Sequence, residues 1–229
     1  DGWRGQEQAA LLLTALDHKP IAGRLVELLE SPRDEVLITA AWGLRQLAVP
    51  ETLAAILDKA TRQTAARKRA PPHPAVDVQV ALMFETLGLM KFGPSEELLR
   101  LYVPKDTQMG DLSRGAAVWG LGKFHADRPD EGLAKQFFER LTDPGIEPPE
   151  TERVRIMSVI AMGTMKTKSQ VEPLRATVYA TVAPIREYMA MRWAMQGLTG
   201  EKMPEPKPAI VTQYGWFLEP LEKSASDEK

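Results

Sequence analysis

The chain has 229 residues, of which 44% are hydrophobic and 26% are charged, and these ordinary globular values exclude disorder over the whole length. Lys and Arg number 29 against 31 Asp and Glu, so the net charge of -2 provides no overall field that would attract nucleic acid or an anionic membrane. No apolar run approaches the roughly 18 residues of a membrane-spanning helix, and the absence of cysteine excludes disulfides, thiolate nucleophiles and cysteine-based metal sites.

The residue usage predicts helices along most of the chain. Ala, Leu, Met and Glu recur with helix-like spacing, and runs of β-branched residues are few. Most of the 18 prolines and 16 glycines fall between these stretches, as in Ser31-Pro32, Gly93-Pro94 and Pro148-Pro149, where they interrupt helices. We therefore expect an all-α protein made of many short helices.

A pattern of apolar and small residues recurs along the chain. Counted from Val36, the residues at offsets 0, 4, 7, 8 and 11 form one stripe along a helix. Later copies of the pattern begin at Val76, Ser113, Val154 and, more weakly, Glu187. The average step of about 38 residues is the length of a two-helix repeat. Small residues at offset 7, such as Gly43 in the first copy, would let neighbouring helices approach closely.

A first helix is predicted before each of these second helices, so that each repeat is a helical hairpin. The expected first helices are Ile21 to Glu30, Glu51 to about Ala66, Ser95 to Tyr102, Glu131 to Leu141 and Gln170 to Val182. We predict one repeat domain over residues 1–200. It begins with an orphan helix at 6–16 and continues with repeats at about 19–48, 50–92, 95–125, 130–166 and 169–200.

Several segments resemble HEAT repeats, particularly the bacterial phycobilisome-lyase-like variety. Val36–Leu47, Arg114–Gly122 and Val154–Met165 are similar to the second helix of such repeats, and Leu25–Pro32 is similar to the first helix and its turn. The likeness covers about residues 19–200. The acidic-then-basic pair that is usual at the family's turn is matched only in part, by Asp34 and by Arg155.

This resemblance implies a right-handed α-solenoid, an α–α superhelix of about five HEAT-like hairpins with capping ends. It also implies a scaffold whose second helices line a concave face that holds a protein or peptide. The residues expected on that face are Arg45, Trp119, Lys123, Arg192 and Trp193. The alternative for the basic residues is that they are ordinary solvated charges.

Large apolar residues occupy offset 6 in every repeat. Trp42, Trp119 and Trp193 stand there in alternate repeats, and Leu82 and Ile160 stand there in the other two. A consistently apolar position favours packing between stacked neighbours. If the rings are exposed instead, they are candidate anchors for a bound peptide.

Basic residues cluster between Asp58 and Pro74. Five basic residues there face one acidic residue, which leaves a local charge of +4. Arg67, Lys68 and Arg69 are the candidate anion-binding residues. The alternative function is therefore that of an anion or nucleic-acid binding protein that uses the basic cluster of residues 59–69. If the cluster binds nothing, it is a solvated connection between two helices.

Catalytic motifs are missing from the sequence, so we expect neither an enzyme nor a cofactor or metal site. His18, His73 and His125 lie far apart, and none has a Glu at metal-helix spacing. The His-Glu steps of HEAT-fold hydroxylases are absent. HEAT-like DNA glycosylases use a basic groove with Trp, Asp and Arg, so Trp119 or Trp193 keeps that alternative open, and the negative net charge counts against it.

The ends of the chain suggest its context. Residues 201–223 are expected to form a capping segment, with Trp216–Leu218 folded back onto the last repeat because an open repeat end exposes core. The alternative is that Trp216 anchors a neighbouring domain. Residues 224–229 are expected to be a disordered tail. Asp1 indicates a processed or excised chain, and the lack of cysteine favours an exported or periplasmic bacterial protein without excluding the cytoplasm. We expect a monomer with an unknown protein or peptide partner.

Overall fold

The computed structural model describes residues 2–67, 73–106, 109–126, 128–143, 145, 148–180 and 185–203. Over this part of the chain the protein has 11 α-helices and no strand, so the all-α prediction is confirmed there. Lys68, Arg69 and most of the predicted capping segment, including Trp216–Leu218, lie outside the described residues, as does the predicted tail.

The helices alternate along the chain between two sets. The odd-numbered helices are α1 (Trp3–Ala15), α3 (Asp34–Leu47), α5 (Pro74–Leu89), α7 (Asp111–Phe124), α9 (Glu152–Met165) and α11 (Ile185–Thr199). The even-numbered helices are α2 (Ala22–Leu28), α4 (Leu53–Arg67), α6 (Glu96–Arg100), α8 (Glu131–Thr142) and α10 (Val171–Ala180). Each odd helix from α3 onward begins two residues before the start of the corresponding sequence pattern.

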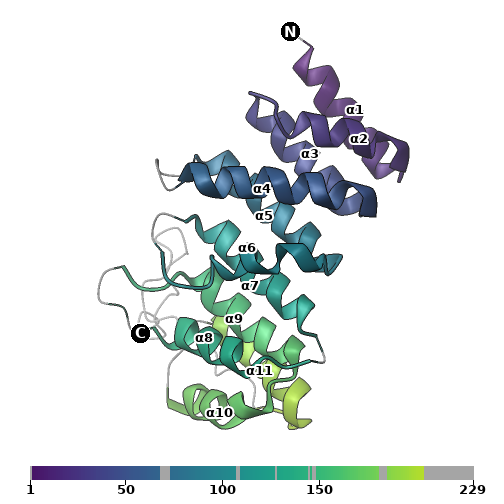
Figure 1. Cartoon of the computed structure of the whole chain (residues 1–229). Helices are drawn as coiled ribbons and strands as arrows, with labels where there is room; N and C mark the ends of the chain where they lie inside the picture. The colour runs from purple at the N-terminus through teal and green to yellow at the C-terminus, as the bar shows by residue number, and fades with distance from the viewer. Residues whose placement is uncertain are drawn as a thin grey trace, which may run out of the picture.

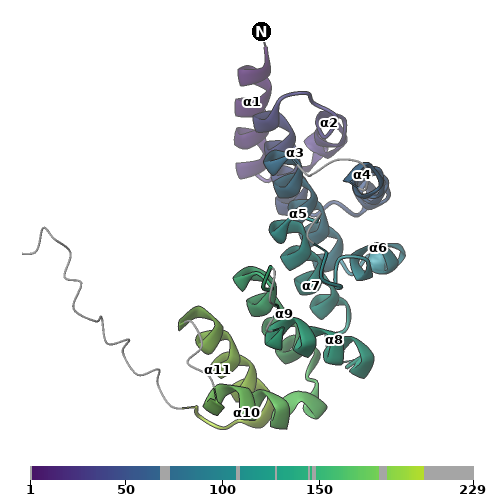
Figure 2. The same ribbon diagram turned by 90° about the vertical axis from the view of Figure 1, so that its left-hand side faces the viewer.

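The two sets of helices form two layers. Each odd helix packs against the next odd helix, from α1 through to α11, and each even helix packs against the odd helix that follows it. Figure 1 shows the helices stacked in chain order. Figure 2 shows that the stack is curved, with the odd helices on its inner side and the even helices on its outer side. We call the surface of the odd helices that faces away from the even layer the inner side.

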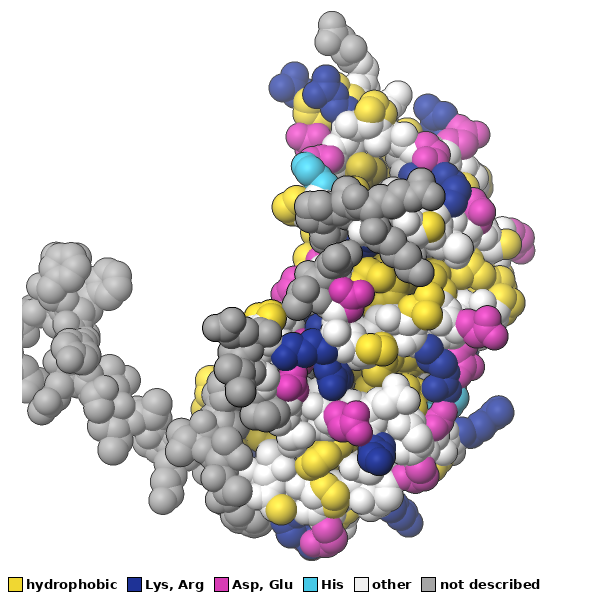
Figure 3. All heavy atoms as spheres, turned by 60° about the vertical axis from the view of Figure 1, so that its left-hand side comes forward, with side chains coloured by type: hydrophobic (Ala, Val, Ile, Leu, Met, Phe, Trp, Pro, Cys, Tyr) yellow, Lys and Arg dark blue, Asp and Glu magenta, His cyan; other side chains and the backbone are white. Residues whose placement is uncertain are grey.

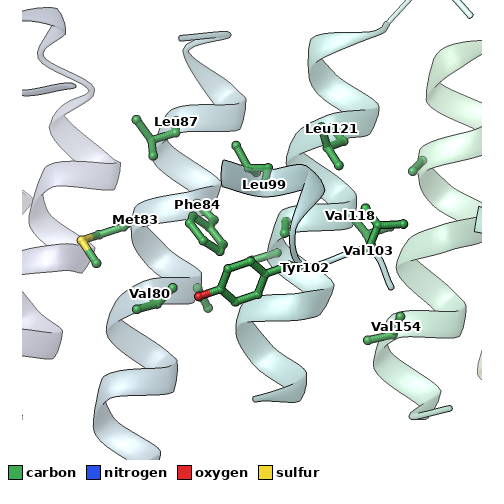
Figure 4. Packing of buried hydrophobic residues seen from close by; sticks show 14 of the residues in the cluster. Val80, Met83, Phe84, Leu87, Leu99, Tyr102, Val103, Val118, Leu121 and Val154 are labelled. Carbon is green, nitrogen blue, oxygen red and sulfur yellow. The ribbon is translucent and has the colours of Figure 1, made fainter. Parts of the chain in front are cut away.

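The main core lies between the layers. In α5, Val80, Met83, Phe84 and Leu87 are almost completely buried, and Figure 4 shows them beside side chains from the α6 region and α7. The rings of Phe84 and Tyr102 meet edge to face, with 4.7 Å between their centroids. These buried positions include offsets 4, 7, 8 and 11 of the sequence pattern, so the stripe read from the sequence is the core side of the helix.

A side chain of α5 also ties successive odd helices together. The Asp77 carboxylate accepts hydrogen bonds from the backbone N–H groups of Leu112 and Ser113, at 3.1 and 3.3 Å. It also accepts one from the Ser113 hydroxyl at 2.6 Å. These donors lie in the first turn of α7, where backbone N–H groups lack partners within the helix and favour a negative charge. Asp77 of α5 therefore caps the neighbouring helix and sets its register.

Small residues let the odd helices approach closely. A β-carbon added to Gly88 of α5 would lie 2.4 Å from the Cα atom of Gly120 in α7, and one added to Gly122 would lie 2.8 Å from the Cα atom of Ala161 in α9. Gly120 and Ala161 occupy offset 7 of their repeats. The small residues at this offset thus have the packing role that the sequence suggested at these two positions.

We expect Gly88→Ala to lower the free energy of unfolding by about 1–3 kcal/mol, because its new methyl group would collide with the backbone of α7. The matched control is Gly197→Ala in α11, where no atom lies within 4 Å of the added carbon. That substitution should stabilise the protein by up to about 1 kcal/mol through helix propensity alone. Urea unfolding followed by circular dichroism measures both. Equal effects of the two substitutions would contradict the close approach.

Candidate functional site

Apolar side chains line the inner side of the odd helices. At 100° per residue, offsets 2 and 6 lie about opposite the buried stripe at offsets 0, 4, 8 and 11. All the residues at these offsets are apolar except Gly115, and none of the side chains is fully buried. We call these residues the apolar ladder: Ile38, Trp42, Val78, Leu82, Trp119, Ile156, Ile160, Met189 and Trp193.

The exposure of offset 6 changes the interpretation of its tryptophans. Trp42 and Trp119 are partly exposed, and 53% of Trp193 is exposed. Packing between stacked neighbours would require buried rings. The packing interpretation therefore holds only in part for all three rings, and least for Trp193.

A hollow opens in the ladder between α9 and α11. It has a volume of about 570 Å³, which lies within the range of ligand-binding pockets in proteins. We call it the C-terminal hollow, and its lining residues are Ile156, Ile160, Ile185, Arg186, Met189, Ala190 and Trp193. The Trp193 ring lies over Gly163 of α9, where a β-carbon would come within 2.8 Å of the ring. The absence of a side chain at Gly163 makes room for this ring.

The charged residues near the ladder differ in their partners. Arg45 forms an ion pair with Glu85 of α5, and the Lys123 ammonium lies 5.2 Å from the centre of the Trp119 ring. Arg186 is exposed at the C-terminal hollow and pairs with no carboxylate among the described residues. On the face seen in Figure 3, acidic and basic side chains are interspersed, so this face carries no field of a single sign.

Arg192 does not share the side of the ladder. It stands at offset 5, where the corresponding residues of earlier repeats are buried. Those residues are Ala41, Ala81, Val118 and Val159. Offset 5 lies on the same side of the helix as Gly88 and Gly122, which face the next odd helix. No described helix follows α11, so Arg192 lies on the end side of the stack. Of the five residues expected on the concave face, the structure therefore brings only some together. The inner side is bordered by Arg45, Trp119, Lys123 and Trp193, but not by Arg192.

Arg67 is part of an internal network. Only 3% of Arg67 is exposed. Its guanidinium donates a hydrogen bond to the Ser113 hydroxyl at 2.8 Å and forms an ion pair with Asp77 at 3.3 Å. Its charge therefore supports the cap on α7 and does not face solvent, where an anion would bind. Lys68 and Arg69 lie outside the described residues.

The other described members of the basic cluster are also paired. Lys59 and Arg62 contact the two oxygens of Glu30, at 2.6 and 2.8 Å. Hydrogen bonds from Arg62 and Lys59 lower the pKa of the Glu30 carboxyl. These contacts join α4 to the end of α2. Part of the local positive charge is therefore neutralised by Glu30 in contacts within the outer layer.

Sequence reasoning missed a buried ion pair next to the start of α9. The Arg114 guanidinium donates two hydrogen bonds to the Glu150 carboxylate, at 2.6 and 2.7 Å, and both side chains are almost completely buried. Losing one partner of a buried pair typically costs about 3–5 kcal/mol. The pair therefore fixes the chain before α9 against α7. No local signal marks Glu150, because its partner lies 36 residues away.

The described residues contain no group of three or more His, Asp or Glu side chains that could hold a metal ion. Nor is any helix in the described ranges both long and apolar enough to cross a bilayer. His125 lies 2.9 Å from Glu96, and Arg100 joins Glu96 to Asp130 at 2.7 Å from each. This polar network lies between α6 and the start of α8, away from the ladder.

Compared with known proteins, the sequence matches no family model, and no curated protein is similar enough to match it.

Glu187 lies in the first turn of α11, next to the hollow residue Arg186, and only 5% of it is exposed. Burial raises the pKa of its carboxyl, while the charge of Arg155 opposes this and that of Glu152 adds to it. Relative to the unfolded chain, folding thus favours the protonated form of Glu187. The contribution of Glu187 to the free energy of unfolding is therefore fully present below the ordinary pKa of 4.5. It is lost as the pH rises through the raised pKa of the native state.

We expect Glu187→Gln to raise the free energy of unfolding at pH 7, because glutamine fills the same space and stays neutral. The difference between the variant and the parent should shrink as the pH falls below 4.5. Urea unfolding at several pH values measures this difference. The raised pKa would be contradicted if the variant were less stable than the parent at pH 7.

Proposed function

We propose that this chain is a non-catalytic interaction scaffold, a HEAT-like α-solenoid that binds a protein or peptide along its concave inner side. The observation that carries the proposal is the apolar ladder, in which partly or largely exposed apolar side chains from five successive odd helices lie on one side of the stack. The ladder is interrupted at α7, where Gly115 stands at offset 2 and the Arg153 side chain lies against it. Soluble proteins rarely keep large apolar surfaces exposed unless they bind something. Large side chains such as Trp193 are the type that dominates binding interfaces.

The arrangement of the helices supports the solenoid part of the proposal. Helical pairs follow one another at a step of about 38 residues, and the main packing contacts of each pair are with its neighbours in chain order. Such pairs cannot bury their apolar sides alone, so stacking is required for stability. A stack of this kind offers an extended surface, which suits a long partner segment better than a small molecule.

The spacing of the ladder suggests the form of the partner. Packed helices lie about 8–10 Å apart, so each step of the ladder covers about that distance. An extended peptide rises about 10 Å in three residues, and a helix rises about 10 Å in seven. The partner should therefore carry apolar side chains about every third residue if it is extended, or about every seventh if it is helical.

The chemistry of the ladder supports binding without catalysis. None of its nine side chains is titratable or nucleophilic, so the ladder side chains themselves cannot act as a general acid or base. The charged side chains at its border, Arg45 and Lys123, already contact Glu85 and Trp119. These residues can orient a partner through electrostatics, and the apolar contact must supply most of the affinity.

The test is to select peptides from a random phage-displayed library against the intact protein. Synthetic versions of the selected peptides are then measured by fluorescence polarisation. We expect Trp193→Ala to weaken binding at least about tenfold, because truncation of an aromatic hot-spot side chain typically costs about 2 kcal/mol or more. The matched control is Leu101→Ala, which removes another exposed large apolar side chain just after α6 in the outer layer.

The control variant should bind within about twofold of the parent. Circular dichroism of both variants checks that the fold is kept. Peptides that bind Trp193→Ala as tightly as the parent would overturn the proposal, as would binding that 0.5 M salt abolishes in every variant. The second result would instead favour an electrostatic site.

A further inference from the structure

The C-terminal hollow brings together three exposed large apolar side chains of α11. Exposure is 56% for Ile185 and 47% for Met189, and Trp193 follows one turn later on the same side of the helix. Isolated exposed apolar residues are common, but a contiguous group around a hollow marks a surface that another group covers. The only charge in its lining is Arg186.

The sequence that follows α11 contains a segment of matching chemistry. Tyr214-Gly-Trp-Phe-Leu218 has three aromatic residues in five, and Glu219 follows it directly. The apolar side chains match the apolar lining of the hollow. The Glu219 carboxylate would complement the Arg186 guanidinium, which has no acidic partner among the described residues. We call residues 214–219 the aromatic segment.

The hollow is within reach of this segment. Met203 lies four residues beyond the end of α11, and it is buried, so the chain is held there. The twelve residues from 204 to 215 can span at most about 40 Å, and α11 itself is only about 22 Å long. Trp216 can therefore reach every turn of α11.

Other apolar and end surfaces fit the aromatic segment less well. A second apolar hollow of about 420 Å³ lies between α1 and α2, but five helix spacings of 8–10 Å, about 40–50 Å, separate it from α11. Arg192 lies on the end side of α11, and Arg175 of α10 pairs with Glu172 and Glu201. An aromatic segment that merely covered this end would bury charged groups, which is costly.

We propose that the aromatic segment docks into the C-terminal hollow of its own chain, with Trp216, Phe217 and Leu218 against the apolar lining and Glu219 near Arg186. This docking adds regulation to the function proposed above. Only the regulation rests on that function, because a partner that contacts Trp193 must first displace the aromatic segment. The apparent affinity of the inner side for a partner is then the intrinsic affinity multiplied by the fraction of molecules in which the aromatic segment is undocked.

The test uses the full chain, which has no cysteine and can therefore carry a single nitroxide label on Glu222→Cys. Paramagnetic broadening of methyl signals in the hollow, from Ile160 and Met189, reports whether the label is close. The Leu13 methyls in the hollow between α1 and α2 are the internal control. The triple variant Trp216→Ala, Phe217→Ala and Leu218→Ala, labelled at the same position, separates docking from mere nearness along the chain.

We expect strong broadening at Ile160 and Met189 but not at Leu13, and recovery of most of the lost intensity in the triple variant. Equal broadening with and without the three apolar residues would overturn the proposal, as would no broadening in either chain. Mixing a spin-labelled chain that is silent in the spectrum with an unlabelled observed chain tests a second copy as the occupant. Broadening in that mixture at the level seen within one chain would also overturn docking within the chain.

This readout needs no partner, so it can succeed or fail independently of the proposed function. The regulatory consequence is tested separately with the selected peptides. The triple variant should bind them at least about threefold more tightly than the parent, because the competing segment is gone. An unchanged affinity would overturn competition for the hollow.

Discussion

The close approach of successive odd helices is the constraint on which the rest of this structure depends. Gly88 against Gly120, and Gly122 against Ala161, leave no room for a larger side chain at these two contacts between α5, α7 and α9. Each of these helices is therefore covered by the odd helix before it, the odd helix after it and the even layer. Only the inner side remains open, so the surface available for binding follows directly from the packing.

The polar network follows from the same stacking. Since the odd helices begin near one another, Asp77 of α5 can cap α7, and Arg67 can pair with Asp77. The Arg114–Glu150 pair holds the chain before α9 in a similar way. Buried charges of this kind are stable only when they are paired. They are therefore enclosed within the protein, whereas the side chains of the apolar ladder stay partly or largely exposed.

The last helix pair differs from the earlier pairs because no described helix follows α11. Its offset-5 residue is Arg192, where earlier repeats carry Ala or Val buried against a neighbour. This side of α11 is polar, as expected for the end of a stack. Its inner side keeps the apolar residues of the ladder and opens into the C-terminal hollow. The end of the stack is thus polar on one side and apolar on another.

The sequence by itself determined the helices, their pairing and their period. Each odd helix from α3 begins two residues before the pattern that predicts it, because the 3.6-residue periodicity of a helix is a local property. It also identified Trp119 and Trp193 as special. Only the tertiary structure decided that Trp193 is exposed, that Arg67 is buried, that Arg192 lies on the end side, and that α9 and α11 enclose a hollow. These outcomes depend on side chains that come from different helix pairs, about 30 or more residues apart in the chain, and no local pattern encodes which of two apolar positions a distant helix will cover.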